Sequence, residues 1–95
     1  MKWGLLIMRE SKVEKEFKKH VEALGGMCEK FVSPGKRSVP DRIVTLPGNR
    51  IIFVELKAPK KDATSAQARD HKKRRTLGCD VRVIDSLEAV NAFPN

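Results

Sequence analysis

Two β-branched runs joined by a proline-glycine turn constrain the fold of this chain more than any other feature. The runs cover residues 41–46 and 50–57, and Pro47-Gly48-Asn49 lies between them. Proline sets the first φ of a type II turn and glycine adopts its positive second φ, so the pattern predicts a β-hairpin. The second run is apolar almost without a break, which predicts a strand in the middle of a sheet, buried on both faces.

Helical and strand patterns on both sides of this hairpin complete the chain. Residues 11–24 predict a helix that ends at Gly25-Gly26, because one apolar stripe runs along it. The stripe consists of Val13, Phe17, Val21 and Leu24. The remaining patterns predict a strand at 27–32, a helix at 64–77, a strand at 80–84 and a closing helix at 86–93 with Ser86 as its N-cap.

The order helix, three strands, helix, strand, helix predicts an α/β fold. A strand followed by a crossover helix and another strand usually pairs in parallel, so the central sheet should be mixed, with helices covering its faces. The helix at 64–77 has only a weak apolar stripe, formed by Ala63, Ala66 and Leu77. With 95 residues, the chain is expected to hold one domain at 9–95, preceded by an extension of uncertain role at 1–8.

The charge of the chain points to an anionic partner. The formal net charge of +8 predicts a surface that attracts nucleic acid, although a basic protein whose charge only aids solubility is equally consistent with composition alone. Cys28 and Cys79 lie far apart in apolar runs, which predicts two buried side chains and neither a zinc site nor a redox pair. The apolar opening is too short to span a bilayer and carries no cleavage pattern, so we expect a cytoplasmic protein.

The hairpin is expected to bring two carboxylates and a lysine together. Its turn pairs residues whose numbers sum to roughly 95 or 96, which places Asp41 opposite Leu56 or its neighbour and close to Glu55. Strand side chains alternate, so Glu55 and Lys57 share one face. Two carboxylates suit Mg²⁺, and the backbone carbonyl of Leu56 offers a further ligand. A metal there would activate a phosphodiester for hydrolysis, while Lys57 would position a water or stabilise charge on the phosphate.

These residues resemble a known nuclease signature. Pro40-Asp41 followed by Glu55-Leu56-Lys57 resembles the PD-(D/E)xK pattern, and residues 10–90 resemble the VRR-NUC family, including the basic loop before Pro40, the segment 64–67 and the strand at 78–86. The resemblance implies a restriction endonuclease-like αβββαβ core, here with a short C-terminal helix. It also implies that Asp41 and Glu55 bind Mg²⁺ or Mn²⁺ and that Lys57 is catalytic.

The resemblance further implies that a glutamate of the first helix completes the acidic cluster. We assign this role to Glu14, which would reach the metal directly or through a water, with Glu10 as the runner-up. Gln67 matches a recurrent glutamine of the family near the site. Both Glu14 and Gln67 have a structural alternative, because each lies three residues after a hydroxyl residue, Ser11 or Thr64, and so fits a helix capping box.

Simpler interpretations exist for other polar residues. Lys57 could be a surface lysine paired with Glu55, yet Glu55 follows four consecutive apolar residues, where an acid without a purpose is costly. His20 and His71 fall on cation-rich helix faces and are expected to be solvated.

DNA contacts are expected from cations near the site and on the second helix. These are Lys36, Arg37, Lys60, Lys61, Lys72 and Lys73, which would contact phosphates without reading sequence. The chain is therefore predicted to be a metal-dependent DNA endonuclease with no membrane or small-molecule partner. Family analogy implies branched DNA such as four-way junctions or flaps, a homodimer because one chain offers one site, and a bacterial or phage-infected cell. The alternatives are a non-catalytic DNA-binding module that retains the fold and an RNA-directed nuclease or binder.

Overall fold

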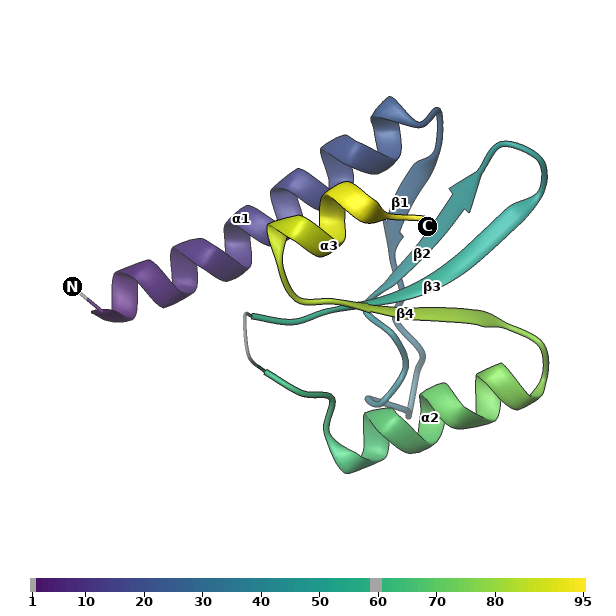
Figure 1. Cartoon of the computed structure of the whole chain (residues 1–95). Helices are drawn as coiled ribbons and strands as arrows, with labels where there is room; N and C mark the ends of the chain where they lie inside the picture. Colours follow the sequence, from purple (N-terminus) through teal and green to yellow (C-terminus); the bar gives the residue numbers. More distant parts are fainter. Residues whose placement is uncertain (1, 59–60) are drawn as a thin grey trace.

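Four strands form one sheet, with two helices on one face and a third helix on the other (Figure 1). This computed structural model describes residues 2–58 and 61–95, and of residues 2–10 the backbone alone. The elements are, in chain order, α1 (Lys2–Ala23), β1 (Met27–Lys30), β2 (Arg42–Leu46), β3 (Arg50–Leu56), α2 (Ser65–Thr76), β4 (Asp80–Ile84) and α3 (Leu87–Ala92). The predicted element order is confirmed.

The sheet is mixed, as the crossover pattern predicted. Its strand order is β1-β2-β3-β4; β2 pairs antiparallel with both β1 and β3, whereas β4 pairs in parallel with β3 after the chain crosses through α2. β3 therefore lies between two partners. At the hairpin turn, Gly48 adopts the expected positive φ of 86°, and Asn49 follows with a φ of 62°. Asparagine tolerates this left-handed conformation better than most residues.

The hydrophobic core lies between the sheet and the pair α1 and α3. Val13, Phe17 and Val21 of α1 are buried there, which confirms three of the four predicted stripe positions. The Phe17 ring packs edge-on against Phe93, with 4.9 Å between ring centroids. Leu24, the fourth position, remains 40% exposed because the helix has already ended at Ala23.

α1 begins much earlier than the sequence pattern predicted. Its backbone is helical from Lys2 instead of from Ser11. Ser11 thus lies inside the helix, where its side chain cannot act as an N-cap, and the capping-box interpretation of Glu14 is wrong. The predicted division between an extension at 1–8 and a domain at 9–95 stays a prediction, although helical backbone runs across that boundary.

The end of α1 is a Schellman motif, which uses the predicted glycine pair. Gly25 has a φ of 83° and its N–H donates to the Glu22 carbonyl at 2.9 Å, while the Gly26 N–H donates to the Val21 carbonyl at 3.0 Å. The chain then enters β1, which ends at Lys30 and is shorter than the predicted 27–32.

The two cysteines are less buried than the sequence predicted. Cys28 and Cys79 are free cysteines and half-buried, not fully buried as expected. Among the residues described, no helix is both long enough and apolar enough to cross a membrane.

Gly26 lies so close to β2 that a side chain would not fit. A Cβ atom at this position would stand 2.6 Å from the Thr45 carbonyl oxygen and 2.7 Å from Leu46 Cδ2. We predict that Gly26→Ala lowers the free energy of unfolding by about 1–3 kcal/mol, because backbone or core must shift. Urea denaturation measures this, and Lys12→Ala on the exposed face of α1 should change stability by less than about 0.5 kcal/mol. Equal stability of Gly26→Ala and the wild type would contradict this packing.

Candidate active site

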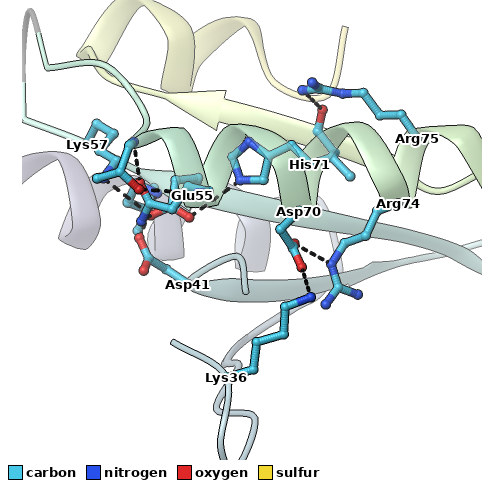
Figure 2. A network of polar contacts seen from close by, with 12 residues as sticks. Lys36, Asp41, Glu55, Lys57, Asp70, His71, Arg74 and Arg75 are labelled. Carbon is cyan, nitrogen blue, oxygen red and sulfur yellow. Dashed lines mark hydrogen bonds and ion pairs between the residues drawn. The ribbon is translucent and has the colours of Figure 1, made fainter. Parts of the chain in front are cut away.

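The hairpin register brings Asp41 to the end of β3. Pairing of Arg42 with Val54 and of Leu46 with Arg50 sets the register, and Asp41 directly precedes β2. As a result, the Leu56 N–H donates to Asp41 Oδ2 at 3.0 Å. The predicted meeting of Asp41 and Glu55 at this edge of the hairpin agrees with the structure, and Figure 2 shows the two side chains next to each other.

Glu55 is a buried acid on the face of β3 that meets α2. Only 1% of its surface is exposed. The pKa of Glu55 is raised to about 8, mainly by burial and also by a hydrogen bond with Asp41 and the negative charge of Asp41, against the opposing charge of Lys57. Glu55 therefore favours its protonated form when no cation is near, because a second carboxyl stands beside it.

Lys57 stands beside this pair of acids. Its Nζ lies 3.8 Å from Glu55 Oε2, and only 18% of its side chain is exposed. The Lys57 N–H donates to the Ile84 carbonyl at 3.0 Å, so the parallel pairing with β4 continues past the end of β3. The ion pair with Glu55 exists, as the simpler interpretation proposed, but Lys57 is mostly buried and is not a surface lysine.

Gln67 forms the predicted capping box and also contacts the candidate site, while its catalytic role stays a prediction. Its N–H donates to Thr64 Oγ1 at 3.2 Å and its Oε1 accepts from the Thr64 N–H at 2.9 Å, which completes a capping box at the start of α2. Its Nε2 meanwhile donates to Glu55 Oε2 at 3.2 Å. The cap thus fixes a side chain that holds one oxygen of the buried acid.

α2 faces the sheet with polar residues, which the sequence analysis did not predict. Its expected apolar stripe is wrong, because Ala66 is exposed and Leu77 is 74% exposed. Asp70 and His71 are the residues of α2 that are buried. Helix spacing explains the arrangement: Gln67 and His71 are four residues apart, and so are Asp70 and Arg74, so each pair lies on one side of the helix.

The prediction that His20 and His71 are solvated is wrong for both residues. His71 is 2% exposed and its Nε2 lies 3.6 Å from Glu55 Oε1. Burial lowers the pKa of His71, and the positive charge of Arg75 lowers it further. His20 is half-buried, with its Nε2 2.6 Å from the Phe93 carbonyl oxygen. The four-residue spacing between Gln67 and His71 is the feature of the sequence from which the position of His71 near the site could have been predicted.

Asp70 ties the basic loop to α2. Its carboxylate, 3% exposed, accepts from Lys36 Nζ at 2.8 Å and from Arg74 Nε at 2.7 Å (Figure 2). The Arg74 guanidinium also lies over the rings of Phe31 and Phe53, at 5.3 and 5.0 Å from their centroids. Lys36, which was expected to contact DNA, is therefore engaged in an internal ion pair.

Glu14 lies near the acids but is paired with a cation. It forms an ion pair with Arg42, and its side chain is 49% exposed. Glu14, Asp41 and Leu56 line the same hollow of about 360 Å³. The side chain of Glu10, the runner-up, lies outside the described residues. The metal role of Glu14 stays a prediction.

The donor atoms at this site fit a hard divalent cation. Asp41 supplies carboxylate oxygens, Leu56 follows Glu55 in the chain and offers its backbone carbonyl, and Glu55 Oε1 is buried without a hydrogen-bond partner among the described residues. Oxygen donors of this kind are those that Mg²⁺ prefers. In the described part of the chain, however, no three His, Cys, Asp or Glu side chains lie closely enough together to hold a metal ion. Two acids and a backbone carbonyl are thus the candidate ligand set.

A second hollow, of about 350 Å³, adjoins the one beside Asp41, and the two share Glu14, Lys30 and Arg42. Lys15 and Lys18 of α1 complete the cationic lining. We call this pair of hollows the α1–β1 groove. Sequence reasoning missed these lysines, because they are far from the motif in sequence and only the packing of α1 beside β1 brings them together.

The cations that were expected to bind DNA divide into three groups. Arg37, Lys61, Lys72 and Lys73 are exposed, Lys36 pairs with Asp70, and Lys60 lies outside the described residues. Lys36 and Lys73 also line a smaller hollow of about 210 Å³. Their DNA contacts stay predictions.

Comparison with known proteins places the chain in a family. It is 46% identical over 88 residues to a protein described as "Putative nuclease p44" from Acyrthosiphon pisum secondary endosymbiont phage 1, covering 93% of this chain and 95% of that protein. A solved structure described as a "VRR_NUC domain" superposes with a TM-score of 0.84 at 36% identity, covering 87% of this chain and 90% of the other. The chain belongs to the VRR-NUC family.

No family model matches this VRR-NUC chain, so the assignment rests on the relative and on the solved structure. It confirms the predicted family and fold, and it identifies the chain as a member of a nuclease family. The αβββαβ order of the VRR-NUC fold, with α3 added at the end, is the frame that carries Asp41, Glu55 and Lys57.

The Asp70 network predicts an acid-dependent loss of stability. Burial by itself would raise the pKa of Asp70, but the hydrogen bonds and charges of Arg74 and Lys36 outweigh it and hold the pKa below its ordinary value of 3.8. A depressed carboxyl pKa stabilises the fold above the ordinary value and loses that contribution as the pH falls through the folded-state value. We expect Asp70→Asn to lower the free energy of unfolding at pH 7 by about 2–3 kcal/mol.

The difference between Asp70→Asn and the wild type should stay constant from pH 7 to about pH 5 and shrink below about pH 4. Urea denaturation at each pH measures it. Asp62→Asn, at an exposed position, is the matched control and should leave stability unchanged. A difference that grows on acidification would show that Asp70 does not stabilise the fold as a carboxylate.

Proposed function

We propose that this VRR-NUC protein is a metal-dependent endonuclease that hydrolyses phosphodiester bonds of DNA. The observation that carries the proposal is the buried Glu55 beside the half-buried Asp41, with Lys57 next to them, at the open end of the β2–β3 hairpin. A buried acid beside a second acid is stabilised in its charged form by a divalent cation, and both acids supply the oxygen ligands that such a cation prefers. The similarity to the phage relative, whose name describes a nuclease, supports the same conclusion.

Each residue of the cluster has a separate task in this proposal. Asp41, Glu55 and the Leu56 carbonyl would hold Mg²⁺ or Mn²⁺, with Glu14 reaching it directly or through a water. When bound, such an ion supplies polarisation of the phosphate and a water of lowered pKa. Lys57 Nζ, beside Glu55, orients the attacking water or stabilises negative charge on the phosphate oxygens. Gln67 keeps the Glu55 carboxylate in place through its hydrogen bond.

The substrate is proposed to be branched DNA, cut by a homodimer. One chain carries one such site, so cleavage of two strands at a four-way junction requires two copies, and a two-fold axis would relate their sites. This part of the proposal is supported by family analogy. The excess of cations, which includes Arg37, Lys61, Lys72 and Lys73, supports a polyanionic substrate.

Cleavage of a labelled four-way junction tests the enzyme proposal. We expect the wild type to nick the junction in Mg²⁺ or Mn²⁺ and not in EDTA. Asp41→Ala should reduce cleavage to background, because a metal ligand is lost. Lys57→Ala should lower the rate by about 10²–10³-fold, because a charge that stabilises the reacting phosphate is lost.

One control variant and three contradicting outcomes separate the proposal from its alternatives. Asp62→Asn, at an exposed acid outside the candidate ligand set, should cleave as the wild type does. Junction binding without cleavage by any of these proteins would instead support a non-catalytic DNA-binding module. Faster cleavage of a matched RNA than of DNA would support the RNA-directed alternative, and equal cleavage of linear duplex and junction would contradict branch selectivity.

The α1–β1 groove is proposed as part of the DNA path, since it opens beside Asp41 and is lined by cations. We predict that the double variant Lys18→Ala/Lys30→Ala binds the four-way junction more weakly than the wild type does. Binding is measured in EDTA, where the DNA is not cleaved. The slope of log Kd against log salt concentration should fall by about 1.8, because each lost phosphate contact contributes about 0.9. The double variant Lys12→Ala/Lys19→Ala removes the same charge from α1 outside the groove and should keep the slope. Equal slopes for both double variants would exclude the groove from the path.

A further inference from the structure

The buried contact between His71 and Glu55 is not explained by the fold or by the candidate ligand set. His71 Nε2 and Glu55 Oε1 lie 3.6 Å apart, and both atoms are buried without a hydrogen-bond partner among the described residues. A buried polar atom left unpaired loses the hydrogen bonds it would make with water and therefore opposes folding. Two such atoms that face each other indicate a pair held ready for an interaction, because an apolar side chain at position 71 would avoid half of this cost.

Gln67 and His71 approach the same carboxylate from one helix. Gln67 Nε2 donates to Glu55 Oε2, and His71 Nε2 faces Glu55 Oε1, so the two residues address the two oxygens separately. They are four residues apart and lie on the side of α2 that meets the sheet. Figure 2 shows the His71 ring directed toward Glu55 from this helix. The capping box with Thr64 anchors the start of the helix and therefore the position of both side chains.

We propose that His71 is a positioning residue that donates a hydrogen bond from Nε2 to Glu55 Oε1 and thereby orients the Glu55 carboxylate toward the metal. This inference rests on the proposed function. The contact needs to shorten by about 0.4 Å to reach hydrogen-bond length, which a small rotation of either side chain provides. With Gln67 on the other oxygen, the carboxylate then has a single orientation. Partners of this kind, which fix a ligating side chain, usually change metal affinity by about 10–100-fold when removed.

Metal binding by the EDTA-treated full-length protein tests this role without relying on cleavage. Isothermal titration calorimetry with Mn²⁺ would compare the wild type with three variants at position 71. His71→Leu removes the donor and should weaken Mn²⁺ binding by about 10–100-fold. His71→Asn is polar but too short to reach Glu55, so we expect a similar loss. His71→Gln restores a donor at about the reach of Nε2 and should bind Mn²⁺ within a few-fold of the wild type.

His20→Gln provides the matched control, because it replaces the other histidine, which contacts the Phe93 carbonyl and not Glu55. It should bind Mn²⁺ as the wild type does. Thermal unfolding of the metal-free proteins identifies any variant that fails to fold, and the comparison of Gln with Asn remains informative if Leu is unstable. In cleavage assays, the Mn²⁺ concentration for half-maximal rate should rise for Leu and Asn and be rescued by Gln.

Two outcomes would overturn the inference in different ways. Equal Mn²⁺ affinity of the wild type and His71→Leu, or weak binding by His71→Gln, would exclude a positioning role while leaving the metal-dependent nuclease proposal intact. No Mn²⁺ binding by the wild type would overturn the proposed metal site, and the role of His71 with it.

Discussion

The antiparallel register between β2 and β3 is the constraint on which the candidate site depends. Opposed residues in this pair have fixed partners from Arg42 and Val54 down to the three-residue turn after Leu46, and a slip of one residue would turn every side chain of β3 to the opposite face. Glu55 would then point into the apolar core under α1. The hydrogen bond from the Leu56 N–H to Asp41 Oδ2 closes the ladder at the end where the acids meet.

The two faces of β3 therefore have different roles: one packs in the hydrophobic core, and the other carries the acid of the candidate site. Ile52, Val54 and Leu56 are buried in the core against α1 and α3, while Glu55 occupies the alternate position toward α2. Burying an acid beside another acid opposes folding, as the raised pKa of Glu55 shows. The apolar face of the same strand offsets this cost, and so the fold tolerates two neighbouring carboxyls at a place where a bound cation would reduce their repulsion.

α2 acts as a polar support for the site and not as a hydrophobic cover. Gln67 and His71 face Glu55, whereas Asp70 gathers Lys36 and Arg74 and thereby joins the loop before Asp41 to the helix. Because these contacts are directional, they fix the helix over the sheet more specifically than an apolar stripe would. The position of Asp41, at the end of that loop, thus depends on a network that starts on α2.

The sequence by itself determined the order of the elements, the hairpin with its register, and the meeting of Asp41 and Glu55, because turn chemistry and strand alternation are local properties. Only the tertiary structure decided that His71 and Asp70 are buried, that Lys36 pairs internally, and that lysines of α1 and β1 share a groove. The physical reason lies in α2 and α1. A helix without an apolar stripe does not reveal which side meets the sheet, and the start of α1 and its place beside β1 depend on packing that local pattern does not record.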